Sequence, residues 1–309
     1  MQDINTIQRI NSQSLYGQLI EQFGHANNYN NTIITNVSDK GIPYITFKPF
    51  YNSKVVKQVF STRLGGVSNG MFESMNLTFN PVGQYNADAP DNVLENFRRM
   101  ATVLDIPVER MVYTRQTHTT NVMVVDDNNA GMGIVKPCSY NNIDGLVTNT
   151  PGLCLVASFA DCIPVILVDE EKKVIANLHA GWRGTVDNIA HNGIKAMTDC
   201  FGCKPEDITA FIGPGICMDC YEVSEDVAKR FQCAYIDKES AFILKKSDTD
   251  GKYKLNLLAA NFINLINLGV QAKNIYVADV CTSCNSDILF SHRASKGQRG
   301  ILCNFIYLK

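Results

Sequence analysis

The chain lacks the features that several classes of protein require. No apolar run approaches the roughly 20 residues that cross a bilayer, and residues 1–12 are polar where a secretory signal is apolar. The net charge of -2 comes with no long basic run, so capture of nucleic acid through its phosphates is not expected. We therefore predict a cytoplasmic protein without nucleic-acid or membrane partners. A small phosphorylated ligand, which needs only about two or three cations, stays open.

Cysteine is present in an odd number. Eleven cysteines cannot all pair internally, and in a cytosolic chain free thiols or metal ligands are the better interpretation. Three pairs have CxxC spacing: Cys200–Cys203, Cys217–Cys220 and Cys281–Cys284. The first two are close enough in sequence to suggest a zinc ribbon. A predicted strand at Ile208–Ile212 would hold them about 16 Å apart, which argues against it. No thioredoxin-like context supports a redox role for the third pair.

The polar composition changes near residue 40. Residues 1–40 are rich in Asn, Gln, Ser and Thr, so we predict a weakly packed N-terminal extension with a short helix around Ser14–Phe23. No repeat, linker or low-complexity tract divides residues 41–309, which predicts one domain.

Apolar periodicity in this domain indicates both strands and helices. Spacings of three and four predict helices at Asp91–Leu104, Thr185–Cys200 and Lys254–Leu268. Short apolar runs between turn residues predict strands at Val55–Thr62, Met111–Thr114, Val122–Val125, Gly152–Phe159, Pro164–Val168, Val174–Leu178, Ile208–Ile212, Ile275–Val280 and Ile301–Tyr307. Helices interspersed with hairpins favour the α+β class over a regular βαβ array.

One predicted hairpin brings together two groups that bind metals. The runs 163–168 and 174–178 are separated by five polar residues, which is typical of an antiparallel hairpin. A turn centred on Glu171 places Ile163 opposite His179, and a shift of one residue places Cys162 there. Opposed Cβ atoms lie roughly 5 Å apart, so the thiol and the imidazole are expected to meet at the open end of the hairpin.

A thiolate and an imidazole at this distance suit zinc, and they equally suit a cysteine nucleophile with its base. His118, which ends a separate strand and turn, is the natural third ligand. Three protein ligands leave one position free, as catalytic zinc sites do. The alternative that Cys162 is a buried apolar thiol and that each histidine caps a loop also stays open.

Two loops combine glycine with arginine. Residues 179–185 lie between a strand and a helix, where free amide groups and Arg183 suit an anion. Residues 62–68 have the same composition around Arg63, so the two loops are candidates for clamping one phosphate. Trp182 suits base stacking or core packing. Among the acidic residues, Glu222 and Asp161 are candidate proton shuttles, whereas Asp144 is more simply a turn carboxylate.

Six ordered segments together resemble the laccase-domain family, long labelled multicopper polyphenol oxidase. The resemblance covers about residues 44–309, and its motifs are 62–68 (TRLGGVS), 116–118 (QTH), 160–165 (ADCIPV), 179–184 (HAGWRG), 212–216 (IGPGI) and 220–223 (CYEV). The chain departs from the family pattern at Asp219, often a cysteine, and at His292, often a tyrosine. The second departure is close to the expected pocket.

The resemblance implies a single-domain α/β sandwich with mixed β-sheets. It implies zinc held by His118, Cys162 and His179, and catalysis by these residues with Asp161. It implies phosphorolysis of adenosine, inosine, guanosine and methylthioadenosine, with adenosine deamination as a further activity. The candidate substrate- or phosphate-binding residues are Arg63, Arg183, Asn76, Gln116 and Glu222.

Two rival functions follow from the same residues. A cysteine hydrolase would use Cys162 and His179 without metal. A copper-dependent phenol oxidase would follow the older family label, but five histidines without a His-x-His pair are too few for several coppers. Copper is therefore the less favoured metal.

Overall fold

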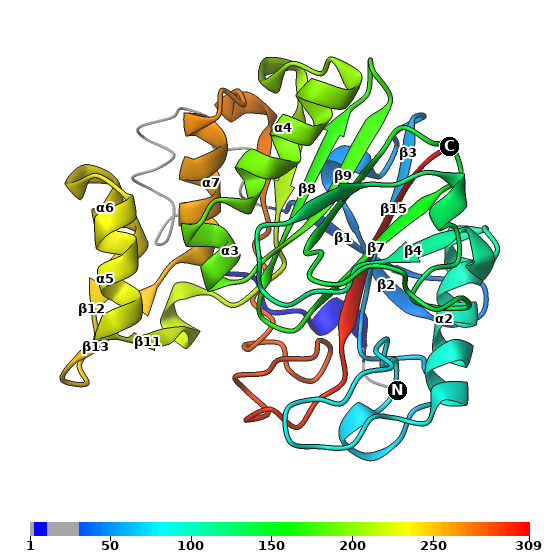
Figure 1. The fold of residues 1–309 in the computed structure, drawn as a ribbon. Helices are drawn as coiled ribbons and strands as arrows, with labels where there is room; N and C mark the ends of the chain where they lie inside the picture. The colour runs from blue at the N-terminus through cyan, green and yellow to red at the C-terminus, as the bar shows by residue number, and fades with distance from the viewer. Residues whose placement is uncertain (1–2, 11–30) are drawn as a thin grey trace.

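Two six-stranded sheets pack face to face in the computed structural model, which describes residues 3–10 and 31–309 (Figure 1). The first sheet has the order β1 (Ile33–Val37), β2 (Pro43–Phe47), β3 (Val56–Ser61), β15 (Leu302–Leu308), β7 (Cys154–Phe159) and β4 (Met111–Tyr113). The second has the order β14 (Ile275–Val277), β10 (Thr209–Ile212), β8 (Ile163–Asp169), β9 (Val174–Ala180), β6 (Gly145–Thr148) and β5 (Val122–Val124). Both are mixed, because β4–β7, β5–β6 and β10–β14 are parallel pairs.

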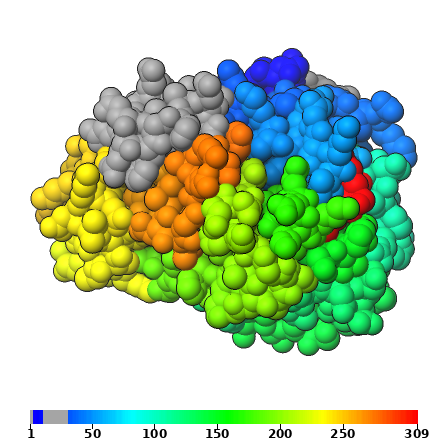
Figure 2. All heavy atoms as spheres, turned by 90° about the horizontal axis from the view of Figure 1, so that it is seen from above, coloured from blue at the N-terminus to red at the C-terminus, as the bar shows by residue number. Residues whose placement is uncertain are grey.

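Helices cover the outer face of each sheet. Helix α2 (Pro90–Leu104) packs on the first sheet, and α4 (Ile189–Phe201) and α7 (Leu257–Asn267) pack on the second. Figure 2 shows α4 and α7 side by side on the surface, in yellow-green and orange. The predicted single-domain α/β sandwich with mixed sheets is confirmed. No helix within 3–10 and 31–309 is long and apolar enough to cross a bilayer.

The core between the sheets is rich in phenylalanine. Phe47 of the first sheet stacks on Phe211 of the second, with ring centroids 3.9 Å apart. Phe60 and Phe159 lie beside them and are fully buried. Aromatic burial of this kind contributes most of the core energy of a sandwich, and it fixes the distance between the two sheets.

Strands β8 and β9 lie at the centre of the molecule, and every residue in both is buried. One face of each contacts the first sheet and the other contacts α4 and α7, which explains their nearly continuous apolar sequences. Their hairpin is confirmed, but the predicted register is wrong by one residue. Ile163 pairs with Ala180 and Pro164 with His179, because the turn has four residues, 170–173. Lys173 in this turn has φ +53°.

Two predicted helices contain breaks. The range Thr185–Cys200 is divided into α3 (Trp182–Val186) and α4, because Asn188 turns left-handed at φ +59° and its side chain accepts from the His191 amide. The range Lys254–Leu268 begins as β13 (Lys252–Leu255), and α7 starts only after its capping residue Asn256. Side-chain caps of this kind outweigh the continued apolar spacing.

A third, small sheet stands beside the sandwich. It has the order β11 (Glu222–Ser224), β13 and β12 (Leu244–Lys246), with α5 (Glu225–Ala234) and α6 (Asp237–Ile243) against it. These elements, like β1, β2 and β6, were not predicted. The strands among them have three to five residues, which is too short for a clear period in the sequence. The other elements predicted within residues 41–309 are confirmed within a few residues.

The packed part of the chain begins before residue 41. Strand β1 lies inside the range predicted as an extension, and it pairs along its whole length with β2. Ile4 and Ile7 join the core between the sheets. The boundary at residue 40 is therefore corrected, since these apolar residues are tied to the sandwich. The helix predicted around Ser14–Phe23 lies outside the described residues.

Candidate functional site

Three side chains from separate segments meet at one end of the second sheet. Cys162 directly precedes β8, His179 lies in β9, and His118 lies in the loop after β4. The Cys162 Sγ and His118 Nε2 atoms are 3.9 Å apart, and the two imidazole centroids are 5.0 Å apart. One donor atom from each residue lies within 4.8 Å of the others. The structure thus brings together the predicted trio.

The approach of these side chains depends on Gly181, which follows β9. A Cβ atom added at Gly181 would lie 2.9 Å from His118 Cδ2 and 3.1 Å from Cys162 Sγ. Both distances are closer than ordinary contacts between such atoms. A residue without a side chain is therefore required for the imidazole and the thiol to occupy these positions.

Asp144 holds two members of the trio in place. It is fully buried, and its Oδ1 lies 2.8 Å from His179 Nδ1. The same carboxylate accepts hydrogen bonds from the amides of Thr117, His118 and Thr119 at 2.9–3.1 Å. Burial raises the pKa of Asp144, but these hydrogen bonds and the imidazole lower it further, to about 2. The contact with Nδ1 leaves Nε2 of His179 directed at the site, as metal-ligating histidines require.

Cys162 and His179 favour each other's charged forms. Burial raises the pKa of the thiol, but the two imidazoles lower it overall to about 6. Burial lowers the pKa of His179, but Cys162 and Asp144 raise it overall to about 9. A thiolate beside imidazoles is a ready ligand for a soft or borderline cation, and it is also a reactive nucleophile.

The trio lies in the wall of a cavity of about 480 Å³. This volume is within the range of sites for small organic ligands. Its lining combines aromatic, cationic and amide side chains with the trio: Gln116, His118, Ser158, Phe159, Ala160, Asp161, Cys162, His179, Trp182, Arg183, Ile216, Tyr221, Leu257, His292, Arg293, Arg299 and Ile301.

Three arginines line this cavity, and only Arg183 was predicted. Its guanidinium carbon lies 4.3 Å from the centroid of Trp182. Arg293 donates to the Glu222 carbonyl at 3.0 and 3.1 Å and lies over Tyr221. Arg299 has a buried Nε without a hydrogen-bond partner among the described residues. Burial lowers its pKa, so an anion in the cavity would relieve the desolvation of this guanidinium.

Asp161 and Gln116 line the cavity as predicted. Asp161 accepts from the Thr282 hydroxyl and from the Arg293 amide, both at 2.7 Å. The Gln116 amide group pairs with the backbone of Ser158, donating at 3.0 Å and accepting at 2.9 Å. Both side chains are thus oriented by hydrogen bonds to neighbouring residues.

Three predicted binding residues lie outside the cavity lining. The Arg63 guanidinium donates to the carbonyls of Glu73 and Ser286 and stacks on Phe290. It therefore holds neighbouring loops together and does not face the cavity. The Asn76 amide is buried and bonded to Asp88. The Glu222 carboxylate accepts from Ser247 at 2.6 Å. The structure therefore does not bring the two predicted glycine loops to one phosphate.

Besides Arg293, two residues of the site were missed. Asp144 has the sequence context of a turn carboxylate. Its contact with His179 depends on the pairing of β6 with β9, beside which the Asp144 carbonyl accepts a hydrogen bond from the His179 amide. Arg299 lies in a polar segment before β15 without a motif. Neither has a local pattern that distinguishes it from a surface residue.

The fold and this site define a laccase-like α/β sandwich with a candidate His–Cys–His metal site. The chain belongs to the family described as multi-copper polyphenol oxidoreductase laccase, whose model matches residues 57–309. Purine nucleoside phosphorylase YlmD of Bacillus subtilis (strain 168) is 31% identical over 259 residues, which are 84% of this chain and 90% of that protein. Adenosine deaminase RL5 of an unknown prokaryotic organism is 32% identical over 254 residues, 82% of this chain and 94% of that protein. The crystal structure of YlmD from Geobacillus stearothermophilus superposes with a TM-score of 0.79 at 31% sequence identity. The superposition covers 86% of this chain and 96% of that one.

Proposed function

We propose that the chain is a zinc-dependent purine nucleoside phosphorylase that also deaminates adenosine. The observation that carries the proposal is the convergence of His118, Cys162 and His179 on the wall of a cavity lined by arginines and aromatic rings. Relatives that cover most of the chain are named as purine nucleoside phosphorylase and adenosine deaminase.

The donor set fits zinc. Two imidazole nitrogens and one sulfur suit its borderline character and its tetrahedral geometry, and three protein ligands leave one position open. Asp144 fixes the ring of His179 and the backbone around His118. Zinc bound there would supply Lewis acidity to the ligand in its fourth position. The older oxidase label would require several coppers held by a histidine-rich cluster, whereas this trio is a single site with two histidines and one cysteine.

In phosphorolysis, a phosphate oxygen forms a bond to the ribose C1′ while the bond from C1′ to the purine nitrogen breaks. The purine leaves with the electron pair and takes up a proton. Positive charge develops at the sugar, so an anion held close to C1′ stabilises the transition state. We assign the phosphate to Arg183 and Arg299, and the proton transfer to Asp161, whose carboxylate is oriented by Thr282. Trp182 and Tyr221 offer apolar surface to the base.

In deamination, water adds to C6 of adenosine and ammonia leaves. The residues that hold the nucleoside are the same, since both reactions need the purine bound against the aromatic wall. Asp161 would move a proton to the leaving amine. The two activities therefore share one cavity and differ in whether phosphate is bound.

The experiment incubates purified protein with adenosine, inosine, guanosine and methylthioadenosine, each with and without phosphate, and identifies products by mass. We expect free base and a sugar 1-phosphate only with phosphate, and inosine from adenosine in either case. His118→Ala should abolish both reactions, and His191→Ala, which changes an exposed histidine of α4, should leave them intact. Consumption of no nucleoside in any mixture would refute the proposal.

A cysteine hydrolase is the second candidate, and the pKa of about 6 for Cys162 favours it. Such an enzyme keeps its activity when metal is removed, whereas the proposed phosphorylase loses it and recovers it with added zinc. Metal removal by a strong chelator followed by readdition of zinc therefore distinguishes the two functions.

A further inference from the structure

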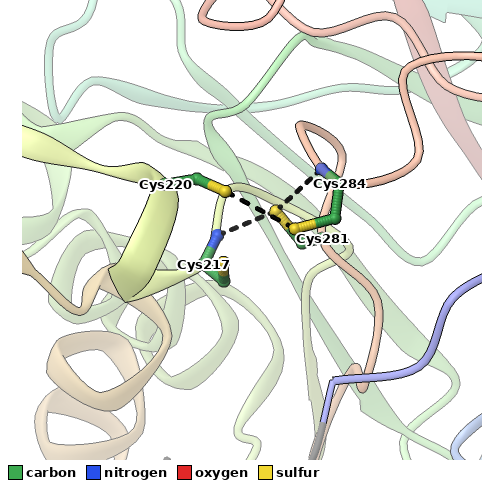
Figure 3. Close-up of side chains that lie close together, drawn as sticks. All are labelled: Cys217, Cys220, Cys281 and Cys284. Carbon is green, nitrogen blue, oxygen red and sulfur yellow. Dashed lines mark hydrogen bonds between the residues drawn. The ribbon is translucent and has the colours of Figure 1, made fainter.

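Two CxxC segments that are far apart in the sequence meet beside the sandwich. Cys217 and Cys220 follow β10, and Cys281 and Cys284 follow β14. Figure 3 shows the four cysteines close together, with the side chains of Cys220, Cys281 and Cys284 directed toward one another. All four sulfur atoms lie within 4.8 Å of one another, and the Sγ atoms of Cys220 and Cys284 are 3.4 Å apart.

The backbone builds this arrangement. Strands β10 and β14 are parallel neighbours, so the segments that follow them leave the same edge of the sheet. Pairing continues beyond the strands, with a parallel bridge between Gly215 and Cys281 and a 3.1 Å hydrogen bond from the Thr282 amide to the Gly215 carbonyl. The cysteines are thus positioned by sheet topology, independently of any contact between their sulfur atoms.

Backbone amides are directed at one of the sulfur atoms. The amides of Cys217 and Cys284 lie 3.2 and 3.4 Å from Cys281 Sγ. Hydrogen bonds to a ligand atom are typical of the groups that support metal ligands. Cys281 is fully buried, so these amides provide it with polar contacts in place of water.

We propose that Cys217, Cys220, Cys281 and Cys284 form a second metal site, a structural zinc site with four thiolate ligands. Zinc–sulfur bonds of about 2.3 Å in a tetrahedron place the sulfur atoms about 3.8 Å apart, close to the separations here. Four protein ligands leave no position for a reactant, so the site is structural. Binding releases the thiol protons to solvent and requires no redox partner.

This site differs from the zinc ribbon considered from the sequence. That prediction paired Cys217–Cys220 with Cys200–Cys203, and the argument against the pairing holds. Cys203 is buried, Cys200 is exposed, and neither belongs to the cluster. The partner is the third pair, 64 residues away from the second.

The site would connect the two loops that shape one wall of the cavity. Ile216 and Tyr221, on either side of the first CxxC segment, line the cavity. Thr282, inside the second segment, donates to Asp161 at 2.7 Å. A cation bound between the two segments would keep Ile216, Tyr221 and Thr282 in fixed positions relative to one another. The proposal does not depend on which reaction the cavity catalyses.

The test measures metal in the full-length chain, purified under reducing conditions without chelators. The wild type should contain about two zinc ions per chain. His118→Ala should retain one zinc ion, and its X-ray absorption should show four sulfur neighbours at about 2.3 Å. Cys220→Ser combined with Cys284→Ser should lose that zinc ion and keep the one at the trio. Cys200→Ser combined with Cys203→Ser alters a CxxC pair outside the cluster and should keep both.

A second readout needs no variant that threatens folding. Cys284 is exposed, as is Cys233 of α5. In the wild type, bound zinc should protect Cys284 from alkylation by at least tenfold relative to the chelator-treated chain, whereas Cys233 should react equally in both. A His118→Ala chain without zinc, a four-sulfur site that holds iron, or a Cys220–Cys284 disulfide in the freshly purified protein would overturn the proposal.

Discussion

Replacing Asp144 by asparagine tests how single side chains hold the trio. The amide has one acceptor oxygen instead of two, and its NH₂ group cannot accept from the His179 ring or from the amides of the 117–119 loop. We expect zinc affinity to fall about 10–100-fold. The free energy of unfolding should fall by about 1–3 kcal/mol. Competition with a chromogenic chelator measures the zinc affinity, and denaturant titration measures the free energy of unfolding.

The matched control is Asp169→Asn. Asp169 is also buried, and it lies at the opposite end of the β8–β9 hairpin, where it accepts from the Lys172 amide at 2.8 Å. This variant should lose stability but retain zinc affinity. Equal loss of zinc affinity in both variants would show that the carboxylate acts through general stability and not through the imidazole.

The pH dependence of thiol alkylation gives a second prediction at this scale. Only the thiolate reacts, so in protein stripped of metal the alkylation rate of Cys162 should reach half its maximum near pH 6, below the ordinary cysteine value of 9.0. The shift depends on His179, and His179→Asn should move the midpoint upward. Peptide mass spectrometry at a series of pH values measures the rate. A midpoint near 9 in the unaltered chain would contradict the contact.

The trio was predictable from the sequence, whereas its supporting residues were not. A hairpin with a thiol and an imidazole at its open end has a local pattern, and the error of one residue in register did not separate them. Arg63 and Arg183 each lie among glycines in a segment that follows a strand, yet only Arg183 reaches the cavity. The difference arises from tertiary contacts. The Arg63 guanidinium stacks on Phe290 and donates hydrogen bonds to two loop carbonyls, so it does not reach the cavity.

At the scale of elements, Gly181 marks the point where β9 leads into α3. Its backbone, with φ of -68°, suits any residue, so Gly181→Ala adds only a Cβ against His118 and Cys162. We expect the variant to fold, to lose at least tenfold in zinc affinity and to lose activity. Metal content and nucleoside turnover measure the effect.

Gly193→Ala is the control for this substitution. Its added Cβ would lie 2.6 Å from Leu178 Cδ1 in the core under α4, away from the trio's donor atoms. The control should lower the melting temperature and keep its zinc. If Gly181→Ala retained full zinc affinity, the close approach of the three ligands at this turn would be refuted.

Element predictions succeeded where apolar runs are long and failed where polar side chains decide. Helix α2 begins and ends almost as predicted, because its apolar spacing is uninterrupted. The helix predicted at 185–200 continues the same spacing across Asn188, whose left-handed backbone and side-chain cap separate α3 from α4. Periodicity reports the buried face of a helix, but not the local hydrogen bonds that end it.

For the whole molecule, the sequence predicted the sandwich and its single domain, but not the way the N-terminal segment is attached. Residues 3–10 and β1 lie in a stretch rich in Asn, Gln, Ser and Thr that resembles an unpacked extension, yet buried Asp279 binds Arg9 and the two residues before β1. It accepts from Arg9 Nη1 at 2.7 Å, from the Asn31 amide at 3.0 Å and from the Thr32 hydroxyl at 3.3 Å. A single distant carboxylate of this kind has no signature in local composition. The cytoplasmic location and the lack of nucleic-acid partners stay predictions.

Removing this carboxylate should release the N-terminal segment from the sandwich. Asp279→Ala leaves the Asn31 amide without its acceptor and removes the ion pair with Arg9, and we expect the free energy of unfolding to fall by about 2–3 kcal/mol. Amide exchange of Ile10, which donates to the Asp279 carbonyl, should accelerate as the segment loosens. Asp127→Ala removes a bridge of equal length to Arg110, but that aspartate side chain is 69% exposed, so its loss should cost less than about 1 kcal/mol. The two ion pairs differ in the burial of the aspartate, so equal stability of the two variants would show that the Asp279 carboxylate does not tie the N-terminal segment to the sandwich.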